Sequence, residues 1–406
     1  MKLVDKPLLA AMCVGQVGNL LPHVVVPAVM PQYLIPLWKL TAGEAGLMAS
    51  AFAVGYMLAV PVLTALTDRV DARLVLLVGS LVSSLATLTF GFFADGLVSA
   101  FLIWGIVGMS FGGAYMPGLK ALTDRLGNME ISRSVTLYTA CFSLGVALSF
   151  LVAQLVADRL GWRAAFYVTA LGPLAMVAVC TVMAPVEPIG SSRRFLDFRP
   201  VFRNRTALGY IFGYGTHCFE LYAFRTWVVA FWAFVAARNN GSAVLEPVTV
   251  SVISAVLAMP ASIVGNEAAI RFGRPRAIAA SMYLAGLIAF LIGALIGAPP
   301  VFLLILLLVY SIAIPADSGA LTSGMTASAE PALRGATMAL HSTIGFGLSA
   351  VGGWVAGVAI DLGGGINTAA GWVAAFLVMA AGGLLGPVAL WWSERPMKQN
   401  RLSPGG

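Results

Sequence analysis

Twelve long apolar segments fill almost the whole chain, and no stretch between them is long enough to form a soluble domain. A helix needs about 20 apolar residues to cross roughly 30 Å of hydrocarbon. Hydrophobic residues make up 59% of the chain and charged residues 10%, a balance that a water-soluble fold cannot bury. Because hydrocarbon offers no partner for an unpaired backbone group, the spans must be helices or a closed barrel. These runs lack the alternation of a barrel, so we expect an all-α integral membrane protein. The predicted spans are 8–34, 44–66, 74–94, 98–121, 134–157, 163–184, 207–235, 247–265, 277–297, 301–328, 335–360 and 370–392.

The placement of Lys and Arg predicts the orientation of these spans. With the amino terminus inside, the cytoplasmic segments hold most of the basic residues, and the opposite loops hold Lys39, Arg159, Arg163 and Arg238. Basic residues favour the cytoplasmic side, so we expect a multi-pass protein of the cytoplasmic (inner) membrane with both termini in the cytoplasm. The net charge of +7 then reports topology and contact with the anionic headgroups of the lipid bilayer, rather than nucleic-acid binding.

A basic break splits the chain into two sets of six spans. We expect an amino-terminal bundle over 1–185, a cytoplasmic linker over 186–206, a carboxy-terminal bundle over 207–393 and a cytoplasmic tail over 394–406. Two local patterns recur across the break at a separation of about half the chain. The sequence Gly161-Trp162-Arg163-Ala164-Ala165-Phe166 returns as Gly371-Trp372-Val373-Ala374-Ala375-Phe376, and the basic turn after the second span returns after the eighth. Such internal duplication is typical of transporters built from repeats.

The basic turn after the second span resembles the loop signature of the major facilitator superfamily, G-x-x-x-D-R-x-G-R-[RK]. Here Asp68, Arg69 and Arg73 match, whereas Thr64, Asp71 and Ala72 replace the two glycines and one arginine. The second copy keeps Arg271, Gly273 and Arg274. The resemblance covers the whole chain and implies two six-helix bundles related by pseudo-symmetry, with transport by alternating access.

In that family the loop latches the cytoplasmic ends of the bundles in one state of the cycle. The resemblance therefore implies a gating role for Asp68, Arg69, Arg73, Arg271 and Arg274. A carboxylate beside helix N-termini and arginine gains charge-assisted hydrogen bonds that break when the bundles rock apart. The alternative is that these residues only decorate a cytoplasmic turn.

Few polar residues lie within the spans, and each is a functional candidate because polar groups are costly in the membrane. All but His341 fall on spans 1, 4, 7 and 10, which the family resemblance makes the cavity-lining helices. Gln16, Asn19 and His23 share one face of the first span. The expected cavity-lining residues are Gln16, Asn19, His23, Tyr115, His217, Arg225 and Ser318. The alternatives are packing between helices for the first-span stripe and snorkelling to the outer interface for Arg225.

Glu220 and Asp317 are the acids placed near mid-membrane, which makes them the candidates for proton coupling. Burial disfavours the charged form of a carboxyl group, so such a group can load and release a proton. Asp317 follows Pro315, which can break the tenth span and expose backbone groups for a substrate or ion. The alternative for Asp317 is a stabilising pair with a neighbouring helix.

Enzyme chemistry has no support in the sequence, because no nucleotide, metalloprotease or nucleophile motif appears in a plausible setting. The four cysteines lie apart within spans, so neither a disulfide framework nor a metal site is indicated, and no cofactor is expected. Basic side chains beside acids would suit a small organic or inorganic anion moved with protons. We therefore predict a secondary active transporter that works as a monomer on a small-molecule substrate. The alternatives are a lipid or lysolipid flippase on the same fold and a non-transporting receptor or scaffold.

Overall fold

The computed structural model describes residues 6–126, 131–188, 197–239, 241, 244–330 and 333–394. Within these ranges the regular structure is helical, without a strand. Part of the predicted linker, 189–196, and nearly all of the predicted tail, 395–406, lie outside the described residues.

The amino-terminal half begins with a broken span and continues with long helices. Its elements are α1 Lys6–Asn19, α2 Val25–Val29, the π-helical η1 Met30–Leu34, α3 Ile35–Trp38, α4 Ala42–Leu66, α5 Ala72–Phe93, α6 Leu97–Thr123, α7 Ile131–Leu160, α8 Trp162–Thr169 and α9 Gly172–Val182.

The carboxy-terminal half has a similar order of elements. They are η2 Val201–Arg203, α10 Arg205–Arg238, α11 Pro247–Phe272, α12 Arg274–Ala294, α13 Pro300–Ala313, η3 Ile314–Asp317, α14 Ser318–Ser328, α15 Arg334–Leu362, α16 Ala369–Gly383 and α17 Leu385–Glu394.

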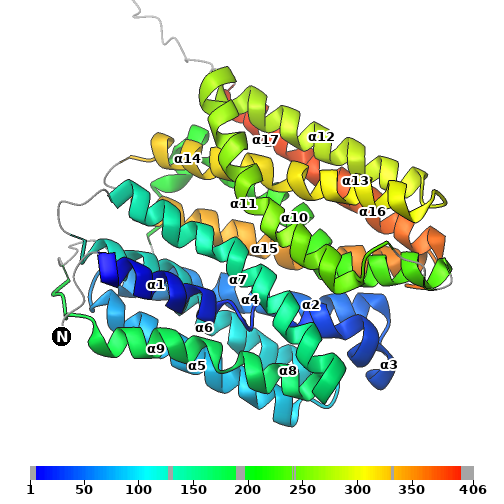
Figure 1. Ribbon diagram of the computed structural model, residues 1–406. Helices are drawn as coiled ribbons and strands as arrows, with labels where there is room; N and C mark the ends of the chain where they lie inside the picture. The colour runs from blue at the N-terminus through cyan, green and yellow to red at the C-terminus, as the bar shows by residue number, and fades with distance from the viewer. Residues whose placement is uncertain are drawn as a thin grey trace, which may run out of the picture.

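These helices confirm the all-α membrane architecture. Among the described residues, eleven segments are long and apolar enough to cross a membrane, and the shorter apolar segment Val25–Trp38 belongs to the remaining span. We call the end of the molecule where α1 and α10 begin the near end, and the end where α4 and α11 begin the far end. In Figure 1 the amino-terminal half, blue to green, lies below the carboxy-terminal half, green to red.

The first span is not the continuous helix expected over 8–34. It stops at Asn19 and resumes at Val25. The backbone between them turns through hydrogen bonds between residues three apart, such as the bond from the His23 N–H to the Leu20 carbonyl at 3.0 Å. Pro22 lies inside this break and has no N–H to donate to a helical carbonyl. The break places His23 off the regular helix, in the middle of the molecule.

Proline interrupts two further spans. Pro315 lies in the 3-10 segment η3 between α13 and α14, which confirms the break expected there. The sixth span divides into α8 and α9 just before Pro173, which the sequence analysis did not anticipate. The chain therefore bends within the membrane where proline removes a helical hydrogen bond.

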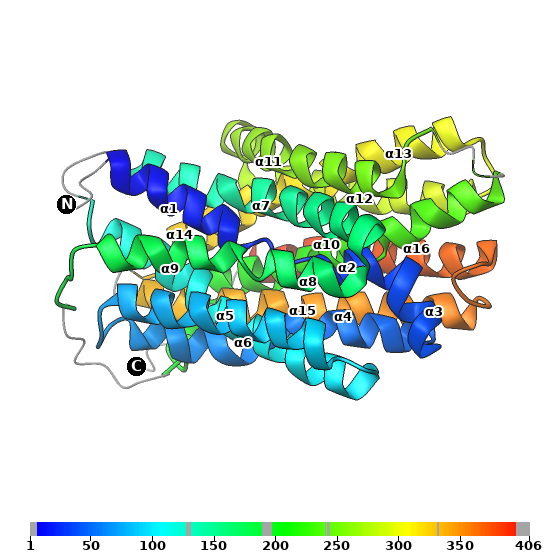
Figure 2. The same ribbon diagram turned by 60° about the horizontal axis from the view of Figure 1, so that its bottom comes forward.

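The two halves meet most extensively along α4 and α15, with further contact between α7 and α11. Figure 2 shows α4 and α15 lying side by side. Glycine permits this approach, because a Cβ on Gly46 would lie 2.6 Å from the carbonyl oxygen of Gly353. Where α4 passes the centre of the molecule, the Ser50 hydroxyl donates a hydrogen bond to the carbonyl of Ala350 at 2.7 Å. The interface between the halves is therefore tight but mostly apolar.

Candidate functional site

A small pocket lies between the two halves where the first span breaks. Its walls come from α2, α4, α10 and α15, and its volume is about 20 Å³. A cavity needs about 10–15 Å³ of such volume to hold one water, so this pocket is nearly closed. The polar residues that line it are His23, Ser50, Tyr222, Arg225, Thr226 and Ser349. We call it the central pocket.

Arg225 supplies the positive charge of the central pocket. Its guanidinium carbon lies 5.6 Å from the ring centre of Tyr222 and 5.8 Å from that of Phe142 on α7. Among the described residues, no carboxylate lies within ion-pair distance of Arg225. A guanidinium in the membrane that faces aromatic rings instead of an acid can accept an anion without first breaking a salt bridge. The structure therefore places Arg225 at the boundary of the halves, not at an outer interface.

His23 is buried beside Arg225 in an aromatic cage. Its ring centre lies 4.8 Å from that of Phe52 and 5.3 Å from that of Phe142. Its Nε2 lies 3.4 Å from the hydroxyl of Tyr222, and its Nδ1 is buried without a hydrogen-bond partner among the described residues. His23 and Tyr222 thus link the two halves by a polar contact whose direction depends on the tautomer of the histidine.

Gln16 and Asn19 share the buried face of α1 but do not line the central pocket. Gln16 Oε1 accepts a hydrogen bond from the Tyr138 hydroxyl at 2.8 Å, within the amino-terminal half. Both amide atoms of Asn19 are buried without a hydrogen-bond partner in the described part of the chain. Gln16 and Asn19 lie closer to the near end than His23 does. The structure therefore separates them from Arg225 and the central pocket.

Glu220 is sealed in a helix contact one turn and a half from Arg225. Its Oε1 accepts a hydrogen bond from the Tyr310 hydroxyl on α13 at 2.8 Å. The backbone of α16 closes the other side, because a side chain at Gly383 would collide with the Glu220 carboxyl group. Glu220 therefore joins α10, α13 and α16 and does not line the central pocket.

Asp317 meets His217 in a second buried contact. His217 Nδ1 lies 2.6 Å from Asp317 Oδ1, and both side chains are almost fully buried. The contact has the distance of an ion pair but not the geometry of a hydrogen bond. His341 on α15 stacks on Tyr214, with ring centres 3.8 Å apart, and Tyr214 in turn stacks on His217. An acid, two histidines and a tyrosine thus gather on the near-end side of Glu220.

A third polar cluster holds the near end of the amino-terminal half together. Both carboxylate oxygens of Asp71 accept hydrogen bonds from Arg125 Nη2 at 2.7 Å, and Asp71 also accepts from the backbone N–H of Val186 and Arg73. Arg73 Nη1 and Arg125 Nε donate to the carbonyls of Met183 and Ala184. Burial raises the pKa of Asp71, but these hydrogen bonds outweigh burial and hold that pKa below its ordinary value.

The loop signature points to Asp68, whereas Asp71 makes the hydrogen bonds of this cluster. Asp71 occupies the N-cap position of α5, which is a signal that the sequence does carry. The named contacts of Asp71, Arg73 and Arg125 all stay within the amino-terminal half. In the second copy of the loop, Arg271 packs over Phe272 at 5.6 Å, and Arg274 begins α12 with a buried Nε that has no described partner.

The remaining candidates lie near these clusters. The Tyr115 ring packs against Phe142 at 5.4 Å, the same phenylalanine that faces Arg225. Ser318 begins α14 directly after Asp317. Tyr222 and Tyr310, which hold His23 and Glu220, were missed because a tyrosine in an apolar span is unremarkable until its partner is known.

Comparison with known proteins gives one family. The family model described as Major Facilitator Superfamily matches residues 12–353. A probable sphingolipid transporter, spinster homolog 1 of Arabidopsis thaliana, is 27% identical over 153 residues, which cover 37% of this chain and 31% of the relative. The chain thus matches about a third of that relative's length.

Two solved structures share the fold. A bacterial homolog of the human lysosomal transporter Spinster, in an inward-facing and occupied conformation, has a TM-score of 0.77 at 16% identity and covers 98% of both chains. A mutant of the nucleoside transporter NupG has a TM-score of 0.76 at 14% identity, covering 96% of this chain and 100% of the other. At these identities the likeness is one of fold.

Proposed function

This chain belongs to the Major Facilitator Superfamily, and on that premise we propose that it carries a small organic or inorganic anion across the cytoplasmic membrane, driven by protons. It is a multi-pass membrane transporter and not an enzyme. The near end, where the basic residues gather, faces the cytoplasm.

Arg225 carries the proposal that the substrate is an anion. It lies in the central pocket with His23, and no described carboxylate neutralises it. An arginine that is kept in the membrane without an acid partner is costly, so its charge is best explained by a ligand. Guanidinium binds carboxylate or phosphate through two parallel hydrogen bonds, and Tyr222 and Thr226 offer further hydroxyl groups.

Alternating access follows from the position of the pocket. His23 and Ser50 come from the amino-terminal half, whereas Arg225 and Ser349 come from the other half. When the halves rock against each other, this pocket opens to one side of the membrane at a time. At about 20 Å³ it must widen to admit a solute, so the described conformation is occluded at this point.

The two buried acids, Glu220 and Asp317, are the proposed sites of proton coupling. Glu220 with Tyr310 and Asp317 with His217 lie on the same half as Arg225, and Glu220 shares α10 with it. Protonation of either acid removes a buried charge and weakens its contact, which favours a different packing of α10 against η3 or α13. This couples the charge state of the carboxyl group to the movement of the helix that carries Arg225.

A second candidate function is movement of an anionic lipid or lysolipid. Arg225 also lines a small apolar pocket with Phe150, Leu221, Phe224 and Ile314, so one cation faces both polar and apolar surroundings. The name of the Arabidopsis relative supports this candidate, though the match covers a minor part of both proteins.

Uptake by proteoliposomes under an imposed pH gradient tests the proposal. The solutes are a monocarboxylate, a dicarboxylate and a phosphate ester, each paired with its neutral amide or alcohol analogue. We expect at least one anion to accumulate with the gradient and its neutral analogue not to accumulate. Equal uptake of neutral analogues would overturn the assignment, and transfer of a fluorescent lysophospholipid without uptake of soluble anions would favour the second candidate.

A further inference from the structure

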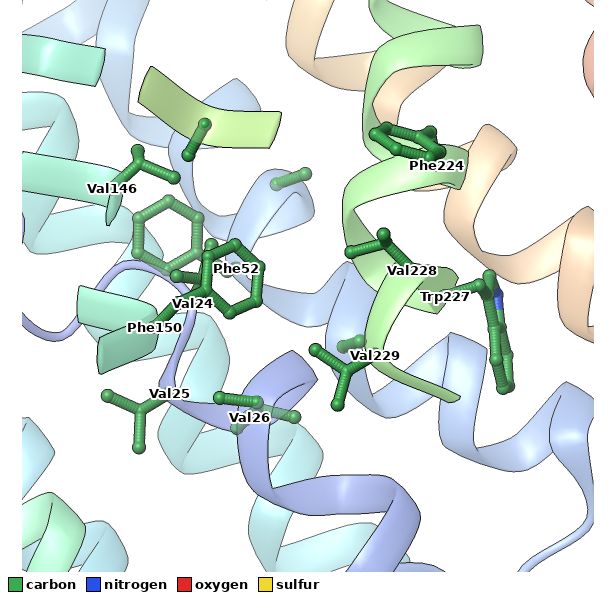
Figure 3. Close-up of a cluster of buried hydrophobic side chains, with 14 of the residues drawn as sticks. Val24, Val25, Val26, Phe52, Val146, Phe150, Phe224, Trp227, Val228 and Val229 are labelled. Atoms are coloured by element: carbon green, nitrogen blue, oxygen red, sulfur yellow. The ribbon is translucent and has the colours of Figure 1, made fainter. Parts of the chain in front are cut away.

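A large cavity opens at the far end, separate from the central pocket. Its volume is about 1070 Å³, and both halves line it. The central pocket reaches Pro27 and Arg225, and this cavity begins at the neighbouring Ala28 and at Val229, one helical turn beyond Arg225. Between the two spaces lies an apolar cluster in which Figure 3 shows Val24, Val25 and Val26 opposite Val228 and Val229 of α10.

One wall of the far-end cavity carries a polar side chain that is held in place by hydrogen bonds. Gln154 on α7 is 8% exposed, and its Nε2 donates hydrogen bonds to Gln32 Oε1 at 3.0 Å and Asp158 Oδ1 at 2.9 Å. The Tyr33 hydroxyl donates to the same oxygen of Asp158 at 3.1 Å. These bonds fix the orientation of the Gln154 amide.

In this orientation the amide oxygen of Gln154 receives no hydrogen bond from a described residue. Gln154 Oε1 is buried and has no hydrogen-bond partner among the described residues. A buried carbonyl oxygen without a donor is destabilising, and a ligand that donates a hydrogen bond there removes that cost. Gln154 and Asp158 both line the cavity, so a ligand bound at the Asp158 carboxylate would lie beside the Gln154 side chain.

The charges around the cavity favour a cationic donor. Glu246 adds a second carboxylate to the lining. Arg238 is the basic residue of the lining, and its Nη1 and Nη2 donate to the carbonyls of Ile296 at 2.6 Å and Gly297 at 3.4 Å. Its donors are thus turned to the backbone between α12 and α13. The two hydrogen bonds that Asp158 accepts from described residues both go to Oδ1, which leaves Oδ2 for a ligand.

We propose that the far-end cavity is a binding site for an organic ammonium group, held by the Asp158 carboxylate and the Gln154 amide oxygen. The apolar wall formed by Val229, Ala233 and Phe234 covers the carbon skeleton of the ligand. This site does not depend on the anion proposal for the central pocket. A substrate with both an amine and an acid would contact both spaces in turn.

Cysteine labelling of the purified full-length protein in nanodiscs tests the site. Ala233→Cys places a thiol in the cavity wall, and its labelling rate is measured with a cationic and an anionic methanethiosulfonate reagent. The parent protein gives the background from native cysteines. Asp158→Asn is expected to slow the cationic reagent and speed the anionic one, each by about threefold, because one charge a few ångströms away in water has about that effect.

Butylammonium, whose N–H groups can donate hydrogen bonds, is the probe for binding. We expect butylammonium to slow labelling of Ala233→Cys by the cationic reagent, and to lose this protection in Asp158→Asn. Asp95→Asn is the matched control, because Asp95 is an exposed acid at the far end that bonds Ser99 in its own helix turn. Absence of protection by butylammonium, or equal effects of Asp158→Asn and Asp95→Asn, would overturn the proposal. Neither result depends on transport of an anion.

Discussion

Asp361, at the far end of α15, accepts a hydrogen bond from the backbone N–H of Ala42 at 2.8 Å, although the two residues lie in opposite halves. Its other carboxylate oxygen accepts from the N–H of Gly43 at 2.7 Å. Thr41 accepts from the N–H of Glu44, so three of the first free N–H groups of α4 have partners. The negative charge of Asp361 meets the positive end of the α4 dipole and fastens the far end of α15 to that of α4.

Asp361→Asn should loosen this contact between α15 and α4. Loss of the charge at a helix N-terminus costs about 1 kcal/mol, or roughly a fivefold change in the equilibrium between the joined and separated far ends of these two helices. Spin labels at Val98→Cys and Leu295→Cys report the far-end distance between the halves by electron resonance. We expect a longer distance to gain population. Asp95→Asn in the same labelled protein is the control, and an unchanged distribution in Asp361→Asn would refute the latch.

Asp71→Asn should destabilise the protein more than Asp68→Asn. It leaves the Arg125 guanidinium, which is 4% exposed, without its carboxylate, and breaking a buried pair costs about 3 kcal/mol. Thermal unfolding in detergent measures the difference. Equal unfolding temperatures for the two variants would show that the Asp71 cluster does not stabilise the fold.

The Asp71 effect should also depend on pH. The pKa of Asp71 is lowered in the folded protein, so its stabilisation is fully present above the ordinary carboxyl pKa of about 4 and is lost as pH falls through the lowered value. The unfolding temperatures of the parent and Asp71→Asn are therefore expected to converge in acid. A difference that stays constant down to pH 3 would contradict this assignment.

A separate prediction concerns gating by Asp68. If the loop gates the transport cycle, Asp68→Asn cuts the transport rate with little change in substrate affinity and alters the cysteine accessibility of the two ends. A large loss of affinity with unchanged accessibility would exclude gating by this residue.

Neutralising the acid that carries the proton should separate accumulation from exchange. Of Asp317→Asn and Glu220→Gln, at least one is expected to abolish accumulation driven by a pH gradient and to spare counterflow, because exchange needs no net proton movement. Tyr310→Phe removes the donor to Glu220 and keeps the acid, so it is the matched control. Normal accumulation in both acid variants would exclude coupling at these sites.

The fold could be predicted from the sequence because the length of apolar runs reports membrane crossing directly. The break at Pro315 was also predictable, since proline stands inside a span beside polar residues. The break after Asn19 was missed, although Pro22 stands between Asn19 and His23 and so gives the same signal. Local composition thus finds spans more readily than bends within them.

The site was predictable as a set of residues but not as an arrangement. His23, Glu220, Arg225 and Asp317 stood out because polar groups are rare in membrane spans. Their pairing depends on tertiary contacts that no spacing reveals: His23 with Tyr222 is separated by 199 residues along the chain, and Asp361 with Ala42 by 319. The central pocket therefore holds His23 and Arg225, while Glu220 and Asp317 lie in their own contacts.

The kinetics of uptake by Arg225→Gln test the central claim most directly. With the anion identified by the uptake screen, we expect KM to rise at least about thirtyfold, because losing the cationic partner of a bound anion costs about 2 kcal/mol or more. Arg163→Gln, which removes a guanidinium that packs on Trp162, should leave KM unchanged. An unchanged KM for the anion in Arg225→Gln would contradict the assignment of the central pocket as the anion site.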